Sequence, residues 1–137
     1  MSDIMYYIKF IMKINLIKFI EYLYYFSLIA LFIIYLFPGS LIGYLLYGDL
    51  RRQPHLLDNF IGTSINHFFF FIYLSFIAFI LNTKKSLTIN GFNLIFLLAI
   101  FLEFTHFIIP NRAFEIYDLL ANVAGVLIIF LLTKLIK

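Results

Sequence analysis

The sequence contains no cysteine, no tryptophan and only three prolines among its 137 residues, and only 12% of its residues are charged. The absence of cysteine excludes disulfides, thiolate metal sites and cysteine nucleophiles. The few basic residues form no patch interleaved with polar residues, so we expect no nucleic-acid partner. The chain is instead 64% hydrophobic with a mean hydropathy of +1.04, whereas soluble domains are about 45–50% apolar. The expected solvent is therefore a membrane.

Four apolar segments predict four membrane-spanning helices. Each approaches the roughly 17–25 residues needed to cross a hydrocarbon core about 30 Å thick, and none shows the alternation of a membrane β-strand. The stretches FPGS, NTKKSLTING and IPNR separate the segments with helix-breaking residues. We therefore expect an all-α membrane protein with a four-transmembrane-helix bundle and one domain over residues 1–137. The helices are predicted at about 16–37, 65–81, 92–109 and 116–136, with an outer loop at 38–59.

The distribution of basic residues predicts which side of the membrane each loop faces. With both termini cytoplasmic, all lysines near the ends of the helices lie inside, and all arginines lie outside. The inner set is Lys9, Lys13, Lys18, Lys84, Lys85, Lys134 and Lys137, and the outer set is Arg51, Arg52 and Arg112. The outer loop at 38–59 is interpreted either as a lid over a polar pocket or as an ordinary surface connection.

Polar residues gather near the outer ends of three of these helices. Glu103 and His106 are three residues apart and share a helix face, and Asp118, Asn122 and Gly125 form a stripe at helical spacing on the last helix. His67 lies near the start of the second helix. Ionisable groups at membrane depth are expected to face the bundle interior and to mark functional sites.

The stretch EFTHFIIPNRAFEIYDLLANVAG, residues 103–125, resembles the signature of the VanZ-like family. The positions that match in identity and spacing are Glu103, Pro110, Arg112, Asp118, Asn122 and Gly125. His106 stands where the family usually has Gln. His67 and the following Phe run fit the histidine of the second helix, although Thr63 and Ser64 replace an Asp-Lys pair. The resemblance implies a small multi-pass protein of the bacterial cytoplasmic (inner) membrane, in a family named for a member associated with teicoplanin resistance and without a settled activity.

Each polar group has a structural and a functional interpretation. Glu103 and Arg112 either tie helices together or form an acid/base group beside an anion-binding arginine. Asp118 and Asn122 are interpreted as a helix cap with interhelical hydrogen bonds, or as part of a ligand site. Ala121 and Gly125 form a small-xxx-small pair, which predicts close helix packing.

The histidines and carboxylates of this cluster are also residue types that bind metal ions. Glu103 and His106 form a Glu-x-x-His pair, and His67 with Asp118 could add ligands. Only one such pair exists where di-metal bundles use two, and the family usually has Gln at the position of His106. We therefore predict no metal and no cofactor, and we expect His106 to be a hydrogen-bond partner of Glu103.

The sequence supports three classes of function. The favoured one is a non-catalytic cell-envelope protein whose polar cluster binds the head group of a membrane lipid or lipid-linked cell-wall precursor, with Arg112 as the anion contact. The alternatives are an enzyme acting on a lipid-linked phosphate substrate, and a proton-coupled transporter of small solutes. A homo-oligomer is compatible with each. The expected ligand-binding cluster comprises Glu103, His106, Arg112, Asp118, Asn122 and His67.

Overall fold

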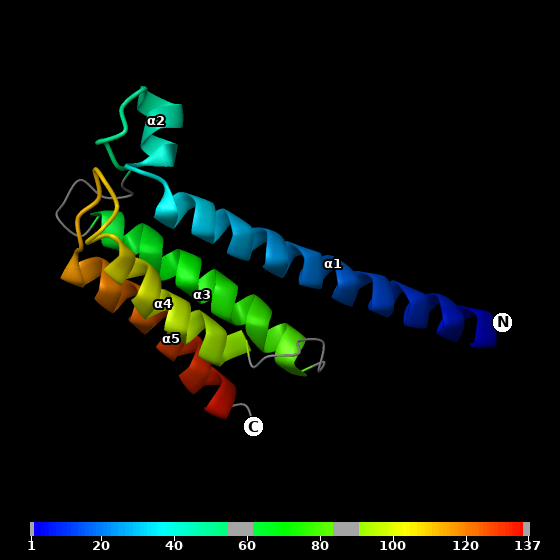
Figure 1. Ribbon diagram of the computed structural model, residues 1–137. Coiled ribbons are helices and arrows are strands. Elements are labelled where there is room, and N and C mark those ends of the chain that lie inside the picture. The colour runs from blue at the N-terminus through cyan, green and yellow to red at the C-terminus, as the bar shows by residue number, and fades with distance from the viewer. Residues whose placement is uncertain (1, 55–61, 84–90, 136–137) are drawn as a thin grey trace.

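The computed structural model describes residues 2–54, 62–83 and 91–135. These residues form five α-helices and no strand: α1 (Ser2–Leu36), α2 (Leu41–Tyr47), α3 (Gly62–Thr83), α4 (Gly91–Thr105) and α5 (Ile116–Leu135). The helices α3, α4 and α5 pack as an antiparallel bundle, and α1 lies against α3 and α4 and projects beyond them (Figure 1). The start of α1 and the end of α5 point to the same end of the bundle, and α2 lies at the other end. The expectation of an all-α protein is confirmed.

Three of the helices are long and apolar enough to cross a membrane: Ile11–Leu36, Ser64–Thr83 and Ile116–Leu135. The helix α4 is apolar but has only 15 residues, which at about 1.5 Å per residue gives it a length of roughly 22 Å. The structure thus shows three candidate spans and one shorter apolar helix. Large apolar side chains also cover the outside of the bundle, as the 86% exposure of Ile108 and the 82% exposure of Leu135 illustrate. Helices that are apolar on every face suit a lipid environment.

Several element boundaries differ from the sequence-based expectation. The helix expected at 92–109 ends at Thr105, because His106 and Phe107 close tighter turns onto Glu103 and Phe104 and because Pro110 disfavours helix before it. The helix expected from about residue 16 begins at Ser2, since the lysines before residue 16 do not interrupt helical backbone. The expected outer loop contains α2, and its residues 55–59 lie outside the described residues.

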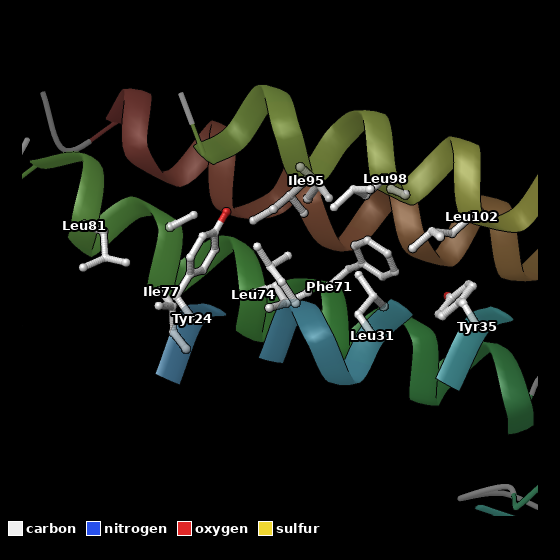
Figure 2. Packing of buried hydrophobic residues seen from close by; sticks show 14 residues of the cluster. Tyr24, Leu31, Tyr35, Phe71, Leu74, Ile77, Leu81, Ile95, Leu98 and Leu102 are labelled. Carbon is white, nitrogen blue, oxygen red and sulfur yellow. The ribbon is translucent and has the colours of Figure 1, made fainter. Parts of the chain in front are cut away.

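The hydrophobic core lies between α1, α3 and α4 (Figure 2). The helix α1 contributes Tyr24, Leu28, Leu31 and Tyr35 at spacings of three or four residues, so one stripe of α1 is buried. Figure 2 shows Tyr24 toward one end of this core and Tyr35 toward the other, next to Leu102. Tyr35 therefore marks the end of the core at which the polar residues gather.

The helices α3 and α5 approach closely where α5 carries Gly125. A Cβ atom at this position would lie 2.7 Å from the backbone oxygen of Phe68 and 3.0 Å from Cβ of Phe71. Ala121, one turn earlier, is half-buried. The small side chain of Gly125 thus lets α3 and α5 bring their polar ends together.

Candidate functional site

A cluster of buried polar side chains lies at the α2 end of the bundle. Glu103 and Asn122 have no exposed surface, and Asp118 and His106 are only 3% and 4% exposed. The side chains come from α1, α3, α4, α5 and the turn after α4. The structure brings five of the six sequence-predicted residues together in two adjacent hydrogen-bonded groups, and the sixth, Arg112, lines a pocket beside them. The members of the polar cluster are Ser64, His67, Glu103, His106, Asp118, Asn122 and Tyr35 of α1.

The carboxylate of Glu103 organises the end of α4. Nδ1 of His106 lies 3.2 Å from Oε1 of Glu103, and the backbone N–H of Glu115 donates to the same oxygen at 3.2 Å. Oε2 of Glu103 and Nε2 of His106 have no hydrogen-bond partner among the described residues. The imidazole of His106 also stacks on Tyr35, with ring centroids 5.3 Å apart. Glu103 therefore holds both the turn that ends α4 and the segment that leads into α5.

Asp118 connects the start of α5 to the start of α3. The hydroxyl of Ser64 donates to Oδ1 of Asp118 at 2.5 Å, and Nε2 of His67 lies 3.5 Å from Oδ2. Asp118 is in the first turn of α5, where a negative charge also suits the helix dipole. These contacts join helices across the bundle.

A chain of hydrogen bonds runs from α4 through α5 and α1 to α3. The amide nitrogen of Asn122 donates to the backbone oxygen of Ala99 at 3.3 Å. The hydroxyl of Tyr35 donates to Oδ1 of Asn122 at 3.0 Å and lies 2.5 Å from Nδ1 of His67. The interhelical role expected for Asn122 thus includes α1.

Tyr35, Ser64 and the backbone of Glu115 were not among the residues expected in the cluster. Tyr35 continues the buried stripe of α1 four residues after Leu31, which is the signal that could have found it. Ser64 precedes His67 by three residues and so shares its helix face. Burial raises the pKa of the half-buried Glu115 carboxyl, and the nearby charges of Asp118 and Glu103 raise it further.

Arg112 is positioned by the turn Ile109-Pro110-Asn111-Arg112. The N–H of Arg112 donates to the oxygen of Ile109 at 3.3 Å, and Asn111 has a φ of 57°. Proline at the second position and a positive φ at the third are typical of a type II turn. Nη2 of Arg112 donates to the backbone oxygen of Ile34 at 2.7 Å, so the turn is attached to the end of α1.

The guanidinium of Arg112 forms no ion pair with Glu103 or any other carboxylate of the described residues, and its Nε is buried without a hydrogen-bond partner there. Burial lowers the pKa of Arg112, while the charges of Glu103 and Asp118 oppose this shift. An arginine remains a cation through such shifts. The sequence-based interpretation of a direct tie between Glu103 and Arg112 is thus replaced by a tie to α1.

A pocket of about 140 Å³ lies between α1, α3, the α2 segment and the turn after α4. Its lining combines polar residues, including Arg112, His67 and His106, with apolar ones, including Leu31, Ile34 and Phe70. The pocket is smaller than the roughly 300–1,000 Å³ of sites that enclose a whole drug-sized ligand. It suits one small group whose remainder extends along apolar helix surface.

The α2 segment, residues 38–54, forms one wall of this pocket through Ser40 and Ile42. Ser40 caps α2 by accepting from the N–H of Gly43 at 2.9 Å, and its own N–H donates to the oxygen of Leu50 at 2.6 Å. A Cβ on Gly43 would lie 1.6 Å from the backbone oxygen of Arg52. The amide of Asn66 on α3 donates to the oxygen of Pro54 at 2.8 Å. The segment is therefore a folded unit attached to α3, and residues 55–59 of the expected outer loop lie outside the described part of the chain.

Comparison with known proteins gives one family. The sequence profile of the VanZ/LLP1 family matches residues 6–137, which is nearly the whole chain. Neither the curated proteins nor the solved structures yielded a significant match. The family and the apolar helices fit a membrane protein of the cell envelope. On this evidence the chain belongs to the VanZ/LLP1 family.

Proposed function

We propose that this protein binds the anionic head group of a membrane lipid or lipid-linked cell-wall precursor, without catalysing a reaction on it. The observation that carries the proposal is the position of Arg112. Its guanidinium lines the pocket, forms no ion pair with a described carboxylate and has a buried Nε without a hydrogen-bond partner in the described residues. A partly buried cation of this kind favours a phosphate or carboxylate that can accept from its planar fork of N–H groups.

The apolar side of the pocket supports a ligand that also carries hydrocarbon. Leu31, Ile34 and Phe70 line the pocket together with the polar residues, and large exposed apolar side chains continue along α1, including Ile33 at 52% and Ile29 at 59% exposure. A head group held by Arg112 would leave its acyl or polyprenyl chain beside this surface. Such burial contributes about 0.8 kcal/mol per CH₂ group.

The topology that we propose places the pocket in the outer leaflet of the bacterial cytoplasmic membrane. In it, α4 and the turns that follow it make the fourth crossing, and both termini are cytoplasmic. The antiparallel order of α1, α3, α4 and α5 supports this arrangement (Figure 1). The arginines Arg51 and Arg112 then lie outside, and Lys13 and Lys134 lie inside.

Mass spectrometry of the lipids that co-purify with the protein tests the proposal. We expect the wild type to retain an anionic lipid species, Arg112→Ala to lose it, and Arg51→Ala to keep it. Arg51 is the matched control because it is an exposed arginine of the α2 segment that does not line the pocket. Equal lipid content in all three proteins would refute head-group binding at Arg112. If the ligand is a cell-wall precursor, Arg112→Ala should also change teicoplanin tolerance at unchanged protein abundance.

A second candidate is an enzyme acting on a lipid-linked phosphate substrate. The observation that favours it is the pair formed by Glu103 and His106, in which the carboxylate contacts Nδ1 and leaves Nε2 of a pocket-lining histidine without a partner among the described residues. This is the arrangement of a general base oriented by a carboxylate. Turnover of a purified polyprenyl phosphate substrate that is lost in Glu103→Gln would establish catalysis and replace the first proposal.

A further inference from the structure

The hydrogen bonds around His67 determine which of its ring nitrogens carries a proton. The backbone oxygen of Ala99 can only accept, so the group of Asn122 beside it is the amide nitrogen, and Oδ1 faces Tyr35. The single hydroxyl proton of Tyr35 is donated to Oδ1 of Asn122. The oxygen of Tyr35 must then accept from Nδ1 of His67, which lies 2.5 Å away. In a neutral imidazole with Nδ1 protonated, Nε2 presents a lone pair.

This lone pair faces a carboxylate. Nε2 of His67 lies 3.5 Å from Oδ2 of Asp118, while Oδ1 of Asp118 is occupied by the hydroxyl of Ser64. Two acceptors that face each other repel unless a proton or a metal ion lies between them. A charge-assisted hydrogen bond would draw the two atoms to about 2.7–2.9 Å. Two ligands of a tetrahedral Zn²⁺, each about 2.0–2.1 Å from the ion, lie about 3.3 Å apart, which is closer to the observed separation.

A third ligand atom belongs to Glu103. His67, Glu103 and Asp118 each offer one ligand atom, and these atoms all lie within 4.8 Å of one another. Glu103 is fully buried, and its Oε1 is used by His106 and by the N–H of Glu115. Oε2 has no hydrogen-bond partner in the described residues, and a buried carboxylate oxygen without a partner is costly at membrane depth. The oxygen that remains available on Glu103 is therefore suited to a cation.

We propose that His67, Glu103 and Asp118 bind a divalent transition-metal ion, for which Zn²⁺ is the best match. Two carboxylates balance the charge of the ion inside an apolar bundle. The imidazole nitrogen favours Zn²⁺ over Mg²⁺ or Ca²⁺, which prefer oxygen ligands. Tyr35 orients His67, and His106 orients Glu103, as hydrogen-bond partners of metal ligands commonly do. Three protein ligands leave a tetrahedral ion one position for water.

The proposal departs from the expectation of no metal in the sequence analysis. That expectation rested on the single Glu-x-x-His pair and on the family's usual Gln at the position of His106, although His67 and Asp118 were recognised as further ligands. The structure uses His106 as a partner of Glu103 and brings Glu103, His67 and Asp118 together from three helices.

The test is Zn²⁺ binding to the full chain, purified without a polyhistidine tag and treated with a chelator, by calorimetry and elemental analysis. We expect one Zn²⁺ per chain. The variants Glu103→Gln and Asp118→Asn should bind Zn²⁺ about 100-fold more weakly or worse, because losing even a group that only orients a ligand lowers metal affinity by about 10- to 100-fold. The matched control is Asp49→Asn, the same carboxylate-to-amide change at an exposed position outside the polar cluster, and it should bind Zn²⁺ as tightly as the wild type does.

Equal Zn²⁺ binding in the wild type and in Glu103→Gln or Asp118→Asn would overturn the assignment. The absence of Zn²⁺ binding by the wild type would also overturn it, because a proton would then occupy the gap between His67 and Asp118. A loss in Asp49→Asn as large as in the other variants would also contradict it. The visible absorption of Co²⁺ bound to the wild type supplies a readout that needs no variant. Absorption typical of tetrahedral nitrogen and oxygen ligands is expected, and the absence of bound Co²⁺ would refute the site. No lipid is needed, so this test can fail while head-group binding stands.

Discussion

The hydroxyl of Tyr35 on α1 donates a 3.0 Å hydrogen bond to Asn122 on α5, across 87 positions of sequence. The same oxygen contacts His67 on α3. Since α1 otherwise meets the bundle mainly through apolar side chains, this hydroxyl is a polar contact that sets how α1 closes the pocket. Tyr35 therefore links the packing of the first helix to the geometry of the polar cluster.

Replacing Tyr35 with Phe should lower the free energy of unfolding by about 1–3 kcal/mol, because buried groups of Asn122 and His67 lose their partner. Denaturant unfolding in micelles measures the change. The control is Tyr22→Phe on the same helix, where the side chain is 73% exposed and no loss is expected. A Tyr35→Phe protein as stable as the control would show that the hydroxyl does not hold α1 in place.

Replacing Gly125 with Ala should separate α3 from α5 and lower the free energy of unfolding by about 1–3 kcal/mol. The added Cβ would meet the backbone oxygen of Phe68 at 2.7 Å, and backbone cannot move aside as a side chain can. Leu131→Phe, an enlargement at a 57% exposed position of α5, serves as control in the same unfolding assay. Equal stability of the two variants would mean that the helices are not in close contact at Gly125.

Asn111→Val should be destabilising by roughly 1–2 kcal/mol, because a β-branched residue is strained at a φ of 57°. Asn111→Gly should be tolerated, since glycine adopts this conformation freely. Because the turn positions Arg112, we also expect Asn111→Val to release co-purified anionic lipid, which mass spectrometry would detect. Identical behaviour of the Val and Gly variants would exclude this role for the turn.

Gly43→Ala should disrupt the α2 segment without unfolding the bundle. Its Cβ would clash with the backbone oxygen of Arg52 at 1.6 Å, whereas the core lies between α1, α3 and α4. We expect loss of head-group binding at nearly unchanged unfolding of the bundle. Leu45→Ala, at a 73% exposed position of α2, should retain binding. Retention of full binding by Gly43→Ala would show that α2 is not needed as a wall of the pocket.

The absence of cysteine makes the topology directly testable with single-cysteine variants. A membrane-impermeant thiol reagent added to intact cells should label Arg51→Cys, and it should label Lys84→Cys only after the membrane is opened. Both positions lie outside the candidate spans, so labelling reports the side of the membrane. Labelling of Lys84→Cys in intact cells would reverse the proposed orientation.

The sequence alone was sufficient to predict the features that depend on residues close together in the chain. Apolar runs predict the long helices, and the spacing of Glu103 and His106 predicts their contact. The shorter α4 was not predicted, because the apolar pattern continues through residues 106–109 after the hydrogen bonds of the helix have ended. The helix α2 could have been found from Ser40 as its cap and Gly48 at its end, whose φ is 69°.

The partners of the polar residues depend on how the helices pack, and no local pattern records this. Tyr35 is one of ten tyrosines in the chain, and although its spacing from Leu31 places it on the buried stripe of α1, its bonds to Asn122 and His67 depend on how α1 packs. The bond from Arg112 to Ile34 likewise spans 78 positions. The membership of the cluster was therefore predictable in large part, while its connections required the fold.

Binding of an anionic lipid at Arg112 is most directly tested by native mass spectrometry of the full chain with phosphatidylglycerol and phosphatidylcholine of matched acyl chains. The wild type and Arg51→Ala should prefer phosphatidylglycerol by about 10-fold or more, as expected for a charge-assisted contact worth about 1.5–3 kcal/mol. Arg112→Ala should lose this preference. An equal preference in Arg112→Ala and the wild type would contradict the proposed head-group site.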